Sequence, residues 1–389
     1  MTNNTEKPRT IVLTGGGTGG HITPILAVAT ELKRQDPTIR IVYIGERSGK
    51  FAHLTEGHSA IDAAYAVYAG KFRRYHGESW LRRLIDVKTN YQNMRDGIFV
   101  SLGFVQSLRL LKKLKPSVVF LKGGFVGVPV GLAAAKCHLP VVTHDSDALP
   151  GLANRLVSKW VTFHATGMPV DFYRYPSDKA RHVGVLVGDA YQPVTSGVQA
   201  SFKEELNIPE QAALVLVTGG SLGAQRLNTA MTQIAPELLE ANPDLHIIHQ
   251  VGKGNHEAYG AYTHNRLHVL EFMQGMHRYT GAADIVVTRA GANTLAELGV
   301  QGKACIVVPN PLLTGGHQLK NAQYLLQQEA VLIASETAKE TDAAMLKDAI
   351  NRLLHDPVQR QGLGAKLQSI TIPDAAHKLA VVLLDIAKK

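Results

Sequence analysis

A glycine-rich loop that ends in a histidine is the segment of this sequence best suited to do chemistry. Five of the six residues at 15–20 are glycine, an apolar run at 11–14 precedes them, and His21 and Pro24 follow. Glycine lets backbone N–H groups approach a ligand closely, and a helix start adds unpaired donors and a positive dipole end. A histidine at this place can accept a proton near neutral pH. The segment predicts a phosphate-containing substrate beside a proton-transfer group, with a helix that opens at Pro24.

A second glycine loop, in the other half of the chain, indicates a matching phosphate site. Residues 219–224 read Gly-Gly-Ser-Leu-Gly-Ala and follow an apolar run. Residues 288–298 also follow an apolar run, and Glu297 lies about one turn into the helix predicted there. Its carboxylate can accept hydrogen bonds from two ribose hydroxyls, and the amides at the helix start can hold phosphate or ribose. An acid that only complements the helix dipole is the competing explanation for Glu297.

Another polar segment follows a predicted strand at 315–321. It contains His317, Gln318 and Asn321, whose side chains carry groups suited to sugar hydroxyls. Capping of the next helix would explain the same residues, so spacing alone leaves both interpretations open.

A metal site is not predicted. Asp145 and Asp147 follow the apolar run at 141–144, and two nearby carboxylates can bind a metal ion. No third acidic ligand is evident beside them, and Cys137 and Cys305 form no CxxC pair. Two cysteines also argue against a disulfide framework and favour a reducing compartment.

The alternation of apolar runs with helical stretches predicts an α/β protein. Strands are predicted at 11–14, 40–44, 117–121, 141–144, 161–164, 214–218, 246–250, 268–271, 285–288 and 305–309. Helices are predicted at 24–35, 97–114, 128–136, 151–158, 224–239, 293–301, 317–328 and 375–389. Such alternation is typical of parallel sheets with helices on both faces. We expect two doubly wound Rossmann-like domains whose glycine loops face a cleft, with a boundary within 176–200.

Positive charge is concentrated in one stretch. The net charge is +9, and residues 71–122 contain twelve Lys or Arg against three acids, a difference of nine. Bulky apolar residues are interleaved with them, which predicts contact with an anionic membrane surface. Nucleic acid is the alternative partner, but no recognised nucleic-acid-binding module is present. An ordinary solvated basic face remains open.

The N-terminus contains no apolar core of a signal peptide, and no apolar run approaches the length of a membrane helix. We therefore expect a cytoplasmic protein.

A dinucleotide-binding enzyme is one alternative function. Gly15, Gly17 and Gly20 match the G-x-G-x-x-G spacing, and Glu46 follows the next predicted strand. The histidine at position 21 and the second glycine loop weaken this interpretation. A P-loop is excluded because no Gly-Lys-Ser or Gly-Lys-Thr follows either loop.

The motifs of the chain resemble those of the MurG family of peripheral membrane N-acetylglucosaminyltransferases, over nearly its whole length. They are Gly-Gly-Thr-Gly-Gly-His (16–21), Gly-Lys-Phe-Arg-Arg-Tyr (70–75), Lys-Pro-Ser-Val-Val-Phe (115–120), Gly-Gly-Phe-Val-Gly-Val-Pro (123–129), Pro-Gly-Leu-Ala-Asn (150–154), Gly-Gly-Ser-Leu-Gly-Ala (219–224) and Glu-Phe-Met (271–273), with the segments 288–298 and 317–321.

The resemblance implies the GT-B glycosyltransferase fold and an inverting hexosyltransferase. Residues 1–187 would bind the acceptor and the membrane, 188–370 would bind UDP-GlcNAc, and 371–389 would return to the first domain as a helix. GlcNAc would pass from UDP-GlcNAc to the 4-hydroxyl of MurNAc-pentapeptide on diphospho-undecaprenol. This is the last cytoplasmic step of peptidoglycan precursor synthesis, at the cytoplasmic face of the plasma membrane. No cofactor or metal would be required.

The resemblance also implies roles for single residues. His21 is the favoured base and Asp145 the other catalytic candidate. Met273 would contact uracil through its backbone, Glu297 the ribose and Gln318 the GlcNAc. The remaining substrate-binding residues would be Thr18, Gly19, Gly20, Asp147, Asn154, Ser221, Ala292, Asn293, Thr294, His317 and Asn321.

Two departures from the family pattern concern the donor. Asp147 stands where the family usually has Asn, and Gly188 stands where an arginine usually follows Gly-Asn-Pro-Val. We hypothesise that Arg226 or Arg289 supplies the missing cation. Alternative functions are a related GT-B transferase with another lipid acceptor, or a non-catalytic nucleotide-sugar-binding homologue. The presence of His21, Glu297 and Gln318 favours the transferase.

Overall fold

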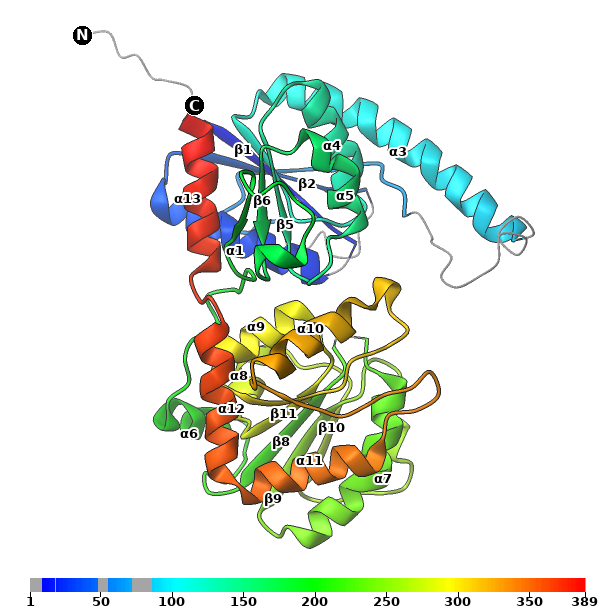
Figure 1. Ribbon diagram of the computed structural model, residues 1–389, viewed down its shortest axis with the longest axis vertical. Coiled ribbons are helices and arrows are strands. Elements are labelled where there is room, and N and C mark those ends of the chain that lie inside the picture. Colours follow the sequence, from blue (N-terminus) through cyan, green and yellow to red (C-terminus); the bar gives the residue numbers. More distant parts are fainter. Residues whose placement is uncertain (1–8, 18, 48–54, 72–85, 221, 389) are drawn as a thin grey trace. The chain divides into compact units, whose positions relative to one another are not determined.

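The computed structural model describes residues 9–17, 19–47, 55–71, 86–220 and 222–388. The chain divides into two compact units, each with its own sheet (Figure 1). Unit 1 comprises Met1–Gly188 and Pro373–Lys389, and unit 2 comprises Asp189–Ile372.

Unit 1 contains a seven-stranded sheet in the order β3-β2-β1-β4-β5-β6-β7, and every pair in it is parallel. The strands are β1 (Thr10–Thr14), β2 (Arg40–Glu46), β3 (Ala63–Val67), β4 (Val118–Leu121), β5 (Val141–Asp145), β6 (Phe163–Thr166) and β7 (Ala180–His182). Strand order reverses between β1 and β4, where Thr14 pairs with Leu121. In doubly wound sheets, ligands bind in the crevice at this switch point, outside the carboxyl ends of the strands.

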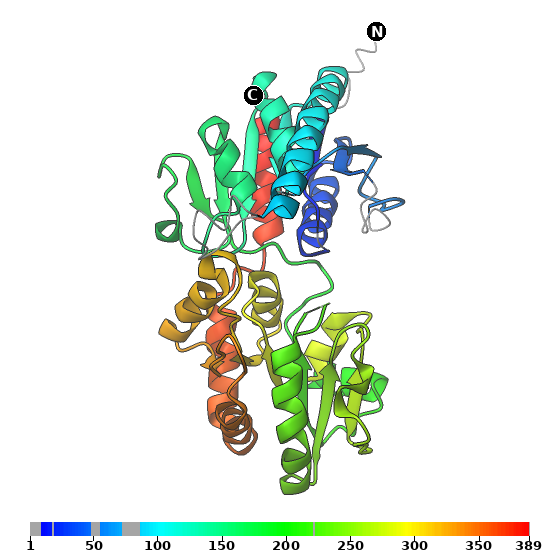
Figure 2. The same ribbon diagram turned by 90° about the vertical axis from the view of Figure 1, so that its right-hand side faces the viewer.

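Helices cover both faces of this sheet. They are α1 (Gly19–Gln35), α3 (Val87–Leu114), α4 (Gly127–Lys136), α5 (Leu152–Val157) and α13 (Ala375–Lys388), with short 3-10 turns at Ser158–Trp160 and Val170–Phe172. Helices α3 and α4 pack together over the side chains of Val12, Val119 and Leu121. Helices α1 and α13 pack against each other, so segments from opposite ends of the chain lie side by side within unit 1 (Figure 2).

Unit 2 repeats the design with a six-stranded parallel sheet in the order β10-β9-β8-β11-β12-β13. The strands are β8 (Ala213–Thr218), β9 (Leu245–Gln250), β10 (Leu267–Leu270), β11 (Ile285–Thr288), β12 (Ala304–Val307) and β13 (Leu332–Ile333). The helices are α6 (Ser196–Glu205), α7 (Gln225–Ala241), α8 (Met276–Ala282), α9 (Ala292–Val300), α10 (His317–Gln327), α11 (Ala343–His355) and α12 (Pro357–Ile370), with 3-10 turns at His256–Tyr259 and Thr314–Gly316. The two parallel α/β domains predicted from the sequence are confirmed.

Alternate residues of each strand in unit 2 serve opposite faces. Val215 and Val217 belong to the core beneath α7 and α11, whereas Leu214 and Leu216 belong to the core beneath α8, α9 and α12. Both faces of the strand are therefore apolar, which is why these strands appear in the sequence as continuous apolar runs.

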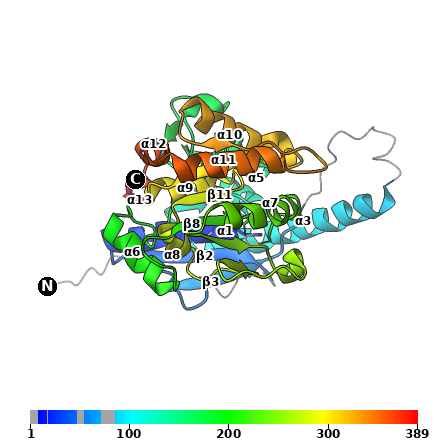
Figure 3. The ribbon, with the colours of Figure 1, turned by 90° about the horizontal axis from the view of Figure 1, so that it is seen from below.

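Two predicted helix starts are wrong. Helix α1 begins at Gly19, so Pro24 lies inside it. Pro24 is the sixth residue of this helix, so its missing N–H removes one regular hydrogen bond, the one to the carbonyl of Gly20. Helix α3 begins at Val87, ten residues before the predicted start, because the side chain of Asp86 caps it by accepting from the Thr89 N–H at 3.0 Å. Its first half projects beyond the rest of unit 1 (Figure 1, Figure 3).

A buried carboxylate joins the final helix to α1. Glu31 accepts hydrogen bonds from Arg34 at 2.7 Å and Gln35 at 2.9 Å, and the Nδ1 atom of His377 on α13 lies 2.5 Å from its Oε1 atom. The hydrogen bond from Arg34, with those from Gln35 and His377, lowers the pKa of Glu31 from 4.5 to about 2 although burial opposes this.

We expect Glu31→Gln to lower the free energy of unfolding by about 1–3 kcal/mol at pH 7, because charged hydrogen bonds are lost. The folded-state pKa lies below the unfolded value, so the wild-type advantage is complete above about pH 4.5 and is lost as the pH falls toward about 2. Urea unfolding at several pH values measures this. Glu237→Gln, on the exposed surface of unit 2, is the control; a Glu31→Gln difference that stays constant down to low pH would contradict the assignment.

Candidate functional site

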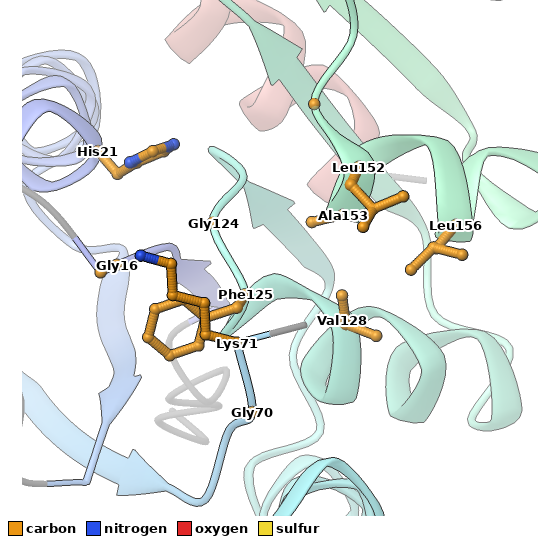
Figure 4. A pocket seen from close by; sticks show the side chains of 12 residues that line it. Gly16, His21, Gly70, Lys71, Gly124, Phe125, Val128, Leu152, Ala153 and Leu156 are labelled. Atoms are coloured by element: carbon orange, nitrogen blue, oxygen red, sulfur yellow. The ribbon is translucent and has the colours of Figure 1, made fainter. Parts of the chain in front are cut away.

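A cavity of about 280 Å³ lies at the carboxyl ends of the strands of unit 1. The first glycine loop, residues 70–71, residues 124–128 and the start of α5 line it. Figure 4 shows the ring of His21 on one side of this cavity and the side chains of Leu152 and Leu156 on another. The cavity therefore joins a proton-accepting group to an apolar wall.

His21 lies in the first turn of α1 and lines the cavity. Its ring faces Gly123, where a Cβ atom would lie only 3.8 Å from the histidine Nε2 atom. Burial and, to a smaller extent, the charge of Lys122 lower the pKa of His21 to about 4, although Asp147 opposes this. The imidazole is therefore neutral at neutral pH and can accept a proton.

Asp145, the other catalytic candidate, is bonded through both of its carboxylate oxygens. Oδ1 accepts from the Gly151 N–H at 2.8 Å and from the Asn154 amide at 2.9 Å, and Oδ2 accepts from the Tyr175 hydroxyl at 2.7 Å. The Asn154 amide also donates to the carbonyl of His144 at 3.0 Å. Asp145 and Asn154 thus hold the loop that leads into α5, and this arrangement favours His21 over Asp145 as the base.

Lys122 lies beneath the glycine loop beside this cavity, although the sequence placed it in the basic surface. It follows β4 directly, is 4% exposed, and donates from Nζ to the Ser146 hydroxyl at 2.9 Å. Burial lowers the pKa of Lys122 to about 8, while Asp145 and Asp147 raise it. The prediction of a basic surface is therefore wrong at Lys122. A count of charges along the sequence cannot distinguish this buried lysine from exposed ones. Arg73, Arg74, Arg82 and Arg83, from the same prediction, lie outside the described residues.

In unit 2, Glu297 lies on α9, five residues after its start at Ala292. Burial raises the pKa of Glu297 to about 7, whereas a hydrogen bond with Tyr191 lowers it. Ala292, Asn293 and Thr294 form the first turn of the same helix, where backbone N–H groups lack partners within the helix. The sequence analysis did not identify Tyr191, because the contact joins residues more than one hundred positions apart.

Other predicted substrate-binding residues of unit 2 are partly or fully buried. Met273 is 4% exposed and its side chain belongs to the core. Gln318 accepts from the Asn310 N–H at 2.9 Å, and Asn321, which is fully buried, donates to the carbonyl of Ala290 at 3.0 Å. His317 is the first residue of α10. These amides position the loops that follow β11 and β12.

Both arginines proposed to bind a phosphate already contact a carboxylate. Arg226 lies 2.6 Å from one oxygen of Glu336 and Arg289 lies 2.7 Å from the other. The Glu336 side chain is fully buried; burial raises its pKa, but the bonds from Arg226, Thr341 and Arg289 hold the pKa below its ordinary value. The structure therefore gives each arginine a structural partner that the sequence did not reveal.

Of the remaining predicted residues, Gly19 and Gly20 open α1, Asp147 lies in the loop after β5, and Thr18 and Ser221 lie outside the described residues. Within the part of the chain that the structure describes, no cluster of three or more His, Cys, Asp or Glu could hold a metal ion. Among the same residues, no helix has both the length and the apolar character to cross a membrane.

Comparison with known proteins identifies the class. Residues 11–166 match the glycosyltransferase family 28 N-terminal domain, and residues 214–379 match its C-terminal domain. The crystal structure of MurG from Acinetobacter baumannii has the same fold, with a TM-score of 0.70 and 23% identity over 97% of this chain and all of that one. CalG4, the calicheamicin glycosyltransferase, is also similar, with a TM-score of 0.67, 15% identity and 98% and 99% coverage. Fold and site define a GT-B glycosyltransferase.

Curated relatives narrow the class to one family. The UDP-N-acetylglucosamine--N-acetylmuramyl-(pentapeptide) pyrophosphoryl-undecaprenol N-acetylglucosamine transferase of Dechloromonas aromatica is 33% identical over 98% of this chain and 99% of its own. The protein of the same name from Caldicellulosiruptor saccharolyticus is 31% identical over 96% of both chains. The chain belongs to the MurG family.

We expect Asp145→Asn to lower the free energy of unfolding of unit 1 by about 1–3 kcal/mol, because the new amide N–H₂ group faces one of the donors now bonded to the carboxylate. Chemical denaturation measures the loss. Asp178→Asn, at an exposed position of the same unit, should unfold like the wild type; equal stability of the two variants would show that the three hydrogen bonds to Asp145 are unimportant.

Proposed function

We propose that this protein transfers GlcNAc from UDP-GlcNAc to the 4-hydroxyl of the MurNAc-pentapeptide on diphospho-undecaprenol, with inversion at the anomeric carbon. The observation that carries the proposal is the neutral imidazole of His21 in the cavity at the switch point of unit 1. The names and nearly full-length coverage of the curated relatives support the same substrates.

The reaction needs one proton acceptor and a site for a departing diphosphate. His21 would take the proton of the acceptor hydroxyl as its oxygen bonds to the anomeric carbon. The bond between that carbon and the UDP oxygen breaks, and UDP leaves with the electron pair. Backbone N–H groups and the dipole at the start of α9 would stabilise its negative charge, so that neither a metal nor a cofactor is required.

Unit 2 would hold the donor through groups on α9 and α10. Glu297 would accept from the ribose hydroxyls, the first turn of α9 would bind the diphosphate, and the backbone of Met273 would contact uracil. Gln318 would bind the sugar. The buried contacts of these residues fix the loops, which is the preorganisation that binding requires.

Helix α3 would bind the membrane surface. Apolar residues recur along it at helical spacing and are 43–63% exposed: Tyr91, Met94, Ile98, Leu102 and Val105. Arg109, Lys112 and Lys113 follow in its last turns. An apolar stripe beside cations suits the headgroup region of an anionic bilayer, and we propose a peripheral protein at the cytoplasmic face of the plasma membrane.

We expect His21→Ala to lower kcat by at least about 100-fold, because general-base catalysis contributes that much or more. The assay measures UDP release from purified protein, UDP-GlcNAc and a short-chain acceptor lipid. UDP binding by calorimetry should persist in His21→Ala and fail in Glu297→Ala. Wild-type kcat, measured at saturating UDP-GlcNAc so that protonation of Glu297 does not limit donor binding, should stay level through neutral pH and fall only as the pH approaches about 4, since His21 must be neutral.

The same assay separates the alternatives. Normal turnover by His21→Ala would sink the assignment of the base. Turnover with a different lipid acceptor only would favour the related transferase, and donor binding without turnover on any acceptor would favour a non-catalytic homologue.

We expect Met94→Ser combined with Leu102→Ser to weaken binding to vesicles that contain anionic lipid, measured by sedimentation. Wild-type binding should fall as salt is added, because salt screens the attraction between cations and headgroups. Val358→Ser, which removes an apolar side chain of 79% exposure in unit 2, should bind like the wild type. Equal binding to neutral and anionic vesicles would remove the electrostatic part of the proposal.

A further inference from the structure

Lys122 is the one buried cation at the carboxyl edge of the sheet among the described residues of unit 1. Its stem packs beneath the first glycine loop, where a Cβ atom on Gly15 would lie 3.2 Å from the Lys122 Cβ. Its ammonium group donates to the hydroxyl of Ser146, which stands between two aspartates in the sequence. A buried ammonium group is costly unless negative charge lies nearby.

The charges around Lys122 come from neighbouring elements. Asp145 ends β5 and Asp147 lies two residues further on, and both attract the ammonium group. His21 lies on the other side of Gly123, the residue after Lys122, and the ammonium group disfavours a proton on its ring. The other titratable groups that face this cluster are His144 on β5, His182 on β7, Tyr173, Tyr175 and Lys71.

We propose that Lys122 is a positioning residue of the transfer reaction, which acts through Asp147 and His21. Its ammonium group offsets the aspartate charge so that an anionic acceptor can enter the cavity, and it adds to the effect of burial in disfavouring a proton on the His21 ring. The inference about catalysis rests on the proposed function; the electrostatic coupling does not.

Lys122 and Asp147 have opposite effects on the pKa of His21. Lys122 lowers this pKa, whereas Asp147 raises it. Removal of the lysine charge should therefore raise the pKa of His21, and removal of the aspartate charge as well should lower it again. A lysine that only filled space would produce neither change, so this pattern separates an electrostatic role from a packing role.

The first experiment measures the pKa of His21 by NMR of histidine ring signals, assigned with His21→Ala. Lys122→Met should raise this pKa by about one unit, and Lys122→Met combined with Asp147→Asn should return it toward the wild-type value. Lys136→Met, at an exposed position of the same unit, is the control and should leave it unchanged. An unchanged pKa in Lys122→Met, or no return in the double variant, would overturn the inference even in an active enzyme.

The second experiment uses steady-state kinetics with the acceptor lipid. Lys122→Met should raise KM for the acceptor about tenfold and change kcat by less than about threefold, because binding of an anion is impaired more than the chemical step. In the double variant, KM for the acceptor should return most of the way to the wild-type value. Asp147→Asn alone should lower the pKa of His21 in the NMR experiment, and this measurement carries the test if Lys122→Met does not fold. An unchanged or higher pKa of His21 in Asp147→Asn would overturn the proposal. Absence of turnover in the wild type and in every variant, with the NMR shifts intact, would instead refute the proposed function.

Discussion

The reversal of strand order between β1 and β4 is the constraint on which the site in unit 1 depends. The chain leaves β1 toward one side and β4 toward the other, so a crevice opens between the two connections. Parallel pairing puts the ends of β1, β4 and β5 at one edge of the sheet. The glycine loop, Lys122 and Asp145 follow or end these three strands. Residues more than one hundred positions apart are thereby brought into one pocket wall.

Burial removes the polar groups at that edge from water, and the lost hydration is compensated differently for each group. His21 gives up its charge, Asp145 accepts three hydrogen bonds, and Lys122 keeps its proton beside a hydroxyl and two carboxylates. Unit 2 follows the same rule, since Glu336 is buried between two arginines. Charges that are removed from water persist only where hydrogen bonds or opposite charges replace the lost hydration.

The success of the sequence-based prediction follows from the kind of sheet. Strands buried on both faces are continuous apolar runs, so nine of them could be located, together with the half-buried edge strand β10. The edge strands β3, β7 and β13 could not be located. Helices α6, α8, α11 and α12 were missed, and the starts of α1 and α3 were misplaced. A cap such as Asp86 acts through one hydrogen bond, which the apolar pattern does not record.

By itself, the sequence determined the two parallel sheets, the glycine loops at their strand ends and the presence of His21 beside one of them, because apolar periodicity and glycine content are local properties. Tertiary structure alone decided which charged residues lie inside. Lys122 is one of twelve basic residues in its stretch, and only the adjacency of β1, β4 and β5 places it in the crevice. Tyr191, Glu336 and the three donors to Asp145 are likewise contacts across the chain, and burial and partner choice are decided by packing that no local pattern encodes.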